Sequence, residues 1–110
     1  MEQKISYKSY TTDELSCLVI DWAKARKIIP NAKPHTQLLK AVSELGELAD
    51  AEIKGDINGI IDGAGDVMVC LINYLALYDL HIRECLGAAY EQIKDRKGTL
   101  LENGVFVKDE

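Results

Sequence analysis

Hydrophobic positions recur at helical spacing through most of the 110-residue chain. Between about residues 12 and 27 they fall at the i, i+3, i+4 and i+7 spacing of one buried helix face, namely Leu15, Leu18, Val19, Trp22 and Ala23. Thr11, with Glu14 three residues later, resembles the capping box that opens a helix. The pattern therefore predicts a first helix, which Pro30 and Pro34 separate from the next.

Three further helices are predicted after the prolines. The second spans about residues 35 to 53 and stacks four apolar residues on one side, Leu38, Val42, Leu45 and Ala49. The third spans about residues 57 to 78, and its middle, residues 67 to 72, is apolar all round, which is typical of a helix buried among others. The fourth spans about residues 82 to 97 and is predicted to face inward through Leu86, Ala89 and Ile93.

The end of the chain predicts a short extended arm. Asn103-Gly104 is a turn signal, and Val105-Phe106-Val107 follows it. Because no linker divides the chain, residues 1–110 are expected to form a single all-α domain. A third helix that is apolar all round and has only three companions also predicts a covering second subunit, in a homodimer or homotetramer.

Composition and charge narrow the classes of function. Apolar residues make up 47% and charged residues 28%, as in soluble globular proteins. The net charge of −5 disfavours extended contact with nucleic acid, which depends on Lys and Arg. No signal-peptide pattern opens the chain, and no stretch approaches the roughly 20 uninterrupted apolar residues that cross a bilayer. We therefore expect a cytoplasmic protein without a membrane partner.

Long polar side chains share one strip of the predicted second helix. At 100° per residue, four of them fall within an arc of about 80°, namely Gln37, Lys40, Glu44 and Glu47. The strip lies roughly opposite the apolar stripe of the same helix. A solvated outer face is the alternative interpretation of this strip.

The predicted third helix carries polar residues where a core is expected. Asp62 and Asp66 lie one turn apart, and Asn73 joins them within an arc of about 40°. Two aspartates at this spacing repel each other, and burying either one without a partner is costly. A divalent cation relieves both penalties. The alternative is that Asp62 flanks the helix start while Asp66 meets a Lys or Arg of another helix.

The two acidic pairs belong to consecutive helices joined by a short turn, which favours antiparallel neighbours. Glu44, Glu47, Asp62 and Asp66 are then expected to face one groove and to hold a metal ion there. Carboxylates with water and phosphate oxygens are the ligands of Mg²⁺, for which Mn²⁺ is a possible substitute. A groove this negative accepts a nucleoside triphosphate only with the metal present.

Basic and aromatic residues supply candidate substrate contacts. Lys94, Arg96 and Lys97 at the end of the fourth helix, together with Lys40, are candidates to neutralise phosphate oxygens. The alternative for the first three is pairing with the helix dipole. Trp22 and Tyr90 are candidates to stack on a base, although aromatics at helical spacing are more often core residues. Gln37 and Asn73 complete the predicted substrate-binding set, and His35 and His81 are expected to be structural.

With these residues in place, the sequence resembles the MazG-like branch of the all-α NTP pyrophosphohydrolases, particularly its short phage-type members. The more specific blocks are Glu44-Leu45-Gly46-Glu47-Leu48 and Gly65-Asp66-Val67. Supporting blocks are Asp21-Trp22-Ala23, Gln37-Leu38-Leu39-Lys40, the run from Ala89 to Gly98, and Gly104-Val105-Phe106-Val107-Lys108. The resemblance implies a four-helix bundle that assembles with a second subunit, magnesium on the acidic motifs, and water attack at the α-phosphate that releases pyrophosphate.

By position, Glu44, Glu47 and Asp66 match the metal carboxylates of that family. The chain departs from the family pattern at Ser43 and Gly63, where the family has glutamates, and Asp62 is a candidate replacement for the second. These departures leave open the number of metal ions and the general base. They also keep open a helical module that binds metal and nucleotide without turnover, and a structural assembly protein whose acidic faces stay solvated.

Overall fold

The computed structural model describes residues 9–109, and these are mostly helical, which confirms the predicted all-α class. In chain order the elements are α1 (Thr12–Ala25), α2 (Ile28–Asn31), α3 (Pro34–Lys54), α4 (Ile57–Ala76), α5 (Ile82–Ile93), β1 (Gly98–Leu100) and β2 (Phe106–Lys108). The four predicted helices are all present. The single-turn α2 was not predicted, and α5 ends about four residues earlier than expected.

The starts and ends of the long helices follow from local chemistry. Thr11 and Glu14 form the predicted capping box, with the Glu14 amide donating to Thr11 Oγ1 at 3.0 Å and the Thr11 amide donating to Glu14 Oε1 at 2.7 Å. Gly55 ends α3 in the left-handed region, at φ 67°. Asp56 then caps α4 by accepting the Gly59 amide at 3.0 Å. The turn between α3 and α4 is therefore only two residues long.

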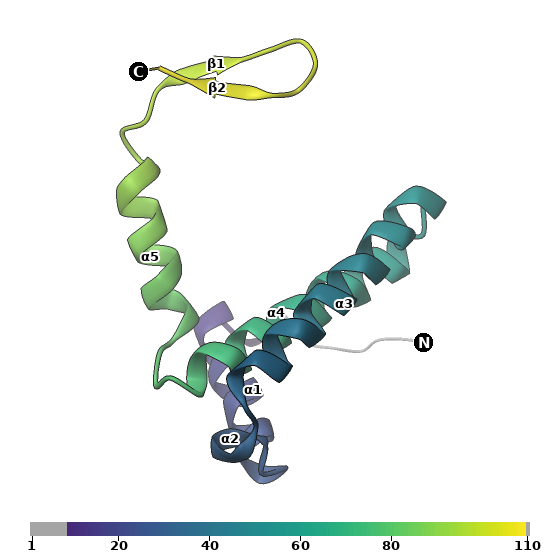
Figure 1. Cartoon of the computed structure of the whole chain (residues 1–110), viewed down its shortest axis with the longest axis vertical. Coiled ribbons are helices and arrows are strands. Elements are labelled where there is room, and N and C mark those ends of the chain that lie inside the picture. The colour runs from purple at the N-terminus through teal and green to yellow at the C-terminus, as the bar shows by residue number, and fades with distance from the viewer. Residues whose placement is uncertain (1–8, 110) are drawn as a thin grey trace.

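This short turn folds α3 and α4 into an antiparallel pair that runs side by side through the molecule (Figure 1). Residues with little or no side chain line the contact. A Cβ placed on Gly63 would lie 3.1 Å from Leu48 Cα, and one placed on Gly59 would lie 3.0 Å from Ala51 Cβ. The two backbones therefore approach each other closely because glycine occupies both α4 positions.

The face of α3 that packs on α4 is not its apolar stripe. Ala41 and Ala51 are buried, and Gln37, Glu44 and Leu48 are half-buried between the helices. The stripe of Leu38, Val42, Leu45 and Ala49 is exposed along its whole length. On a helical wheel, the stripe lies about 120° from the residues that face α4. The sequence pattern thus marked a real apolar face, but not the one that α4 covers.

The predicted inward face of α5 is wrong for the single chain. Leu86, Ala89 and Ile93 are all exposed, because α5 leaves the other helices soon after it begins (Figure 1). The extended arm is present as half of a hairpin, since β1 and β2 pair antiparallel with Thr99 opposite Val107. The helices α1, α3 and α4 thus form the packed part of the chain, and α5 does not close a fourth side.

The helix α4 is the central element of this packed part. It is the one helix among residues 9–109 whose length and hydropathy would also suit a membrane span. A helix at the centre of several others has the same character. Hydropathy therefore does not by itself assign α4 to a membrane.

Candidate functional site

An acidic hollow lies along one side of the α3–α4 pair, near the turn between them. Its volume is about 440 Å³, and its lining is Glu47, Asp50, Ala51 and Lys54 from α3 with Asp56, Gly59, Asp62, Gly63 and Asp66 from α4. Three of the four predicted carboxylates, Glu47, Asp62 and Asp66, are therefore brought together. We name this feature the acidic hollow.

Sequence reasoning missed three charged residues of the acidic hollow. Asp50 and Asp56 add two carboxylates, and Lys54 is the single cation of the lining. Asp56 also caps α4, so its sequence signal was that of a helix start. Asp50 lies one turn after Glu47 on α3, a spacing that was available in the sequence.

Two contacts fix the alignment of α3 with α4, and they locate Glu44. Leu48 lies against Gly63, and Ala51 against Gly59. Because the two helices are antiparallel, one turn back along α3 from Leu48 corresponds to one turn forward along α4 from Gly63. Glu44 is therefore level with Asp66. The fourth predicted carboxylate therefore lies one layer beyond the acidic hollow, on the interface of the two helices.

The environment of Cys70 supports this alignment independently. Burial raises the pKa of the Cys70 thiol, the Lys40 ammonium opposes the rise, and the carboxylates of Glu44 and Asp66 add to it. The thiol therefore lies within electrostatic reach of all three charges. Lys40 Nζ is 3.4 Å from Glu44 Oε2, as expected for two residues predicted to share one strip of the helix.

The four carboxylates do not form a ready-made ligand cage. Within residues 9–109, no group of three or more His, Cys, Asp or Glu side chains is close enough to hold a metal ion together. The carboxylates of Glu47, Asp62 and Asp66 are exposed and border one volume. Mg²⁺ needs no larger set, since it commonly uses one or two carboxylates with water and substrate phosphates.

Gly63 explains one departure from the family pattern in physical terms. The position is buried against the backbone of Leu48, where even a Cβ would be crowded. A glutamate there would force α3 and α4 apart. Asp62, the neighbouring residue, lines the acidic hollow, and its role as a replacement stays a prediction.

Asn73 is the most deeply buried of the predicted polar residues. Its side chain is 1% exposed, and its Oδ1 has no hydrogen-bond partner. The alignment of the helices brings half-buried Gln37 level with it. A buried amide oxygen without a partner is costly, so this layer is a polar position that a donor group of a ligand or a water would stabilise.

An apolar hollow lies close to the acidic one. It is lined by Val69 of α4 and by four residues of α1, Leu15, Leu18, Val19 and Trp22. Val69 follows Asp66 by three residues, so the two hollows are one helical turn apart along α4. The Trp22 ring is 46% exposed and carries the Arg26 guanidinium 5.2 Å from its centroid. Tyr90 lines a different hollow, between α1, α4 and α5.

The predicted cations of the C-terminal region are not brought to the acidic hollow. Arg96 and Lys97 line a hollow between the end of α5 and β2, and Lys94 Nζ pairs with Glu91 at 2.8 Å. Figure 1 shows this end of α5 well apart from the turn between α3 and α4. Among residues 9–109, Lys54 lines the acidic hollow and Lys40 pairs with Glu44.

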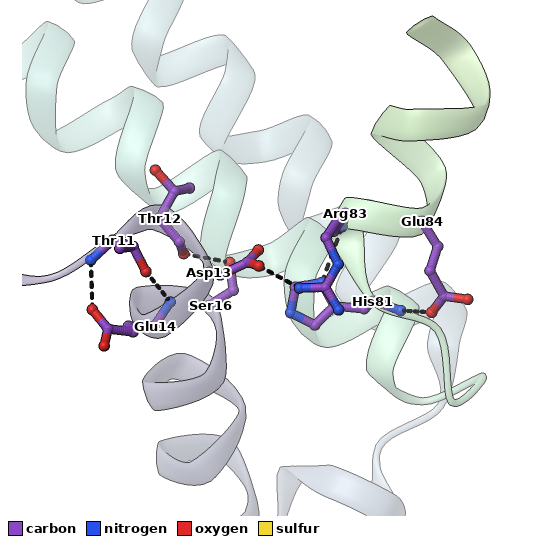
Figure 2. Close-up of polar contacts among 8 residues, drawn as sticks. All are labelled: Thr11, Thr12, Asp13, Glu14, Ser16, His81, Arg83 and Glu84. Atoms are coloured by element: carbon purple, nitrogen blue, oxygen red, sulfur yellow. Dashed lines mark hydrogen bonds and ion pairs between the residues drawn. The ribbon is translucent and has the colours of Figure 1, made fainter. Parts of the chain in front are cut away.

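The histidine at the start of α5 has the structural role that was expected. Its Nδ1 accepts the Arg83 amide at 3.0 Å, and its own amide donates to Glu84 Oε1 at 2.8 Å (Figure 2). Arg83 in turn forms an ion pair with Asp13 of α1. His81 thus caps a helix and lies away from the acidic hollow.

Comparison of the chain with protein-family models, with characterised proteins and with solved structures gave no match. No relative therefore assigns a role to any residue. The assignment of a function therefore depends on the chemistry of the acidic hollow.

Proposed function

We propose that the chain is a magnesium-dependent nucleoside triphosphate pyrophosphohydrolase, which converts a (d)NTP to a (d)NMP and pyrophosphate by water attack at the α-phosphate. One observation carries the proposal. Carboxylates from two adjacent helices, Glu47 with Asp62 and Asp66, border a single hollow, and Glu44 lies level with Asp66. A hollow with five carboxylates and one lysine attracts divalent cations strongly.

The metal would be held by Glu44 and Glu47 of α3 and by Asp62 and Asp66 of α4. When bound, Mg²⁺ neutralises phosphate charge and favours deprotonation of a nearby water, and Mn²⁺ is expected to substitute. The carboxylates themselves orient the cation, and any of them that is left free can accept a proton from the attacking water. Lys54 at the rim offsets charge on the leaving pyrophosphate.

The remaining groups define where the nucleoside would lie. The apolar hollow at Trp22 offers a stacking surface for a base, one turn from Asp66. Asn73 presents an unpartnered amide oxygen, and Gln37 lies level with it. Lys94, Arg96 and Lys97 reach the phosphates only from a neighbouring subunit or after movement of α5, which is consistent with a homodimer or homotetramer as the active form.

A second candidate is a module that binds metal and nucleotide without turnover. The close packing of Gly63 on Leu48 favours it, because this position cannot supply the carboxylate that the family pattern has there. Ser43 is a second lost carboxylate. Nucleotide binding in the presence of Mg²⁺ without release of pyrophosphate would identify this function.

The direct test is a panel of nucleoside triphosphates with Mg²⁺, scored for pyrophosphate against orthophosphate. Glu47→Ala and Asp66→Ala should each lower pyrophosphate release by at least about 100-fold, because each removes a carboxylate that would hold the Mg²⁺ ion facing the phosphates. Glu102→Ala, an exposed carboxylate of the β1–β2 turn, is the matched control and should keep full activity. Circular dichroism should show unchanged helix content. Full activity of both hollow variants would disprove the site.

A further inference from the structure

The single chain exposes more surface than a compact protein of its mass. Its accessible surface is 8506 Å², whereas the size scaling of compact monomers gives about 6,100 Å² for 12.2 kDa. Its radius of gyration is 16.6 Å, against about 13 Å for a compact domain of this length. About 2,400 Å² of extra surface is therefore exposed. A standard interface covers about 800 Å² on each partner, so the excess is large enough for a stable dimer.

Part of the excess is the apolar stripe of α3. Leu38, Val42 and Leu45 are 41%, 63% and 54% exposed, and Ile53 at the end of the helix is 83% exposed. The stripe spans most of a 21-residue helix, about 31 Å long at 1.5 Å per residue. It therefore offers a long, straight apolar surface at helix spacing.

Charge is separated between the two ends of this stripe. Residues 22–43 contain five Lys and Arg but no Asp or Glu, whereas residues 44–66 contain seven Asp and Glu but one Lys. We name Lys24, Arg26, Lys27 and Lys33 the basic pole, which lies around α2 and the start of α3. We name Asp50, Glu52 and Asp56 the acidic pole, which lies at the opposite end of α3 (Figure 1).

Ion pairs of the described residues do not neutralise the basic pole. Among residues 9–109, no ion pair joins any of its four cations to a carboxylate, and Arg26 instead stacks on Trp22. All four are exposed. Unpaired charges of one sign at one end, with the opposite sign at the other, favour a partner whose charges run in the reverse direction.

We propose that the occupant of the α3 stripe is a second copy of this chain, packed antiparallel about a two-fold axis. The two stripes then cover each other, and each basic pole lies against the partner's acidic pole. In a two-fold interface every contact occurs twice, so the same pairing of a basic pole with an acidic pole forms at both ends of the interface. The antiparallel direction also places opposite ends of the two α3 dipoles together. The interface does not rest on the proposed enzymatic function, although Asp50 and Asp56 of the acidic pole also line the acidic hollow.

Charge reversal at the poles tests both the partner and the direction. Lys24→Glu/Lys27→Glu/Lys33→Glu changes the charge of the basic pole from +4 to −2, so that both poles are acidic. Asp50→Lys/Glu52→Lys changes the charge of the acidic pole from −3 to +1, so that both poles are basic. Each variant alone should dimerise at least about tenfold more weakly than the wild type in sedimentation equilibrium, because like charges face each other twice. An equimolar mixture of the two should restore association as heterodimers, since opposite charges meet again at both ends. Lys108→Glu and Glu102→Lys, both in the hairpin, are matched controls and should dimerise as the wild type does.

The mixing step keeps the test decisive if one variant folds poorly. Recovery of heterodimers requires both chains to be folded and their poles to be complementary. Three outcomes overturn the proposal: a wild type that stays at 12.2 kDa at high concentration, variants that dimerise as tightly as the wild type, or a mixture of helical variants that stays monomeric. A wild type that stays monomeric would assign the stripe to a different protein.

Discussion

The α3–α4 pair and the arm formed by α5 with the β hairpin are built from equally clear sequence patterns, yet they differ in what holds them. In the pair, Gly59 and Gly63 let two backbones come into van der Waals contact, and charged residues gather beside that contact. In the arm, every residue from Arg83 to Asp109 is exposed. One region fixes the positions of the residues of the proposed site, and the other has an apolar face that residues 9–109 of the single chain leave uncovered.

This difference teaches that a periodic pattern locates a face but does not say what covers it. The glycines Gly59 and Gly63 allow α3 and α4 to pack directly on each other. This contact forms within one chain. The apolar residues of α5 specify only that some surface must meet them. Site chemistry is thus concentrated where the chain itself fixes the geometry.

Cysteine reactivity should give the largest contrast between the two regions. Cys70 of α4 is buried, and its pKa is raised by burial and by nearby carboxylates, whereas Cys85 of α5 is exposed. Because the thiolate is the reactive form, we expect iodoacetamide to label Cys85 at least about 100-fold faster than Cys70 at pH 8. Peptide mass spectrometry over time measures both rates in one sample.

The same measurement has a pH dependence of known sign. A raised thiol pKa keeps Cys70 neutral below the ordinary value of 9.0, and its labelling should increase only as the pH rises beyond that value. Correspondingly, the stabilisation from a neutral buried thiol is present below pH 9.0 and is lost above it. Equal labelling of Cys70 and Cys85 at pH 8 would show that the α3–α4 contact is open in solution.

A glycine substitution in each region should give the next largest contrast. Gly63→Val introduces two methyl groups where a Cβ alone would lie 3.1 Å from Leu48 Cα. We expect a loss of about 2 kcal/mol or more in the free energy of unfolding, which is typical of overpacking. Gly87→Val in α5, where nothing lies within 4 Å of the new Cβ, should change it by less than about 0.5 kcal/mol. Urea unfolding at one fixed protein concentration compares the variants.

The glycine pair is also a test of the site. If Gly63→Val forces the helices apart, pyrophosphate release should fall as well, because Glu47 and Asp66 border the same hollow from different helices. A Gly63→Val protein as stable and as active as the wild type would mean that the two backbones are not in close contact. A large effect of Gly87→Val would mean that α5 is packed in solution.

Much of the fold was accessible from sequence because its signals are local. The capping box at Thr11, the stop at Gly55 and the acidic pairs one turn apart each involve residues within a few positions of one another. The four helices follow from such signals. The antiparallel approach of α3 and α4 follows from the shortness of their turn, and with it the gathering of Glu47, Asp62 and Asp66.

The remaining features of the fold depend on how each helix is rotated about its own axis and on contacts between residues far apart in the sequence. Which face of α3 meets α4 is decided by the close contacts of Gly63 with Leu48 and of Gly59 with Ala51. A hydrophobicity pattern ranks such small residues below a leucine stripe. The position of α5 depends on contacts far apart in sequence, so its exposed face was assigned inward. The spacing of Asp50 from Glu47 was available in the sequence, whereas the place of Lys54 at the hollow depends on that rotation.

The smallest effect is expected at the junction of the two regions. Asp13 of α1 and Arg83 of α5 form the ion pair that joins the arm to the packed helices within residues 9–109 (Figure 2). Both side chains are more than half exposed, so Arg83→Ala should lower the free energy of unfolding by less than about 1 kcal/mol. Its local effect should be clearer, because amide exchange in the first turns of α5 reports the freedom of the arm. Faster exchange there with unchanged exchange in α4 is the expected result, with Arg96→Ala, beyond the C-terminal end of α5, as control. Unchanged exchange in α5 would mean that the His81 cap or a partner subunit holds the arm instead.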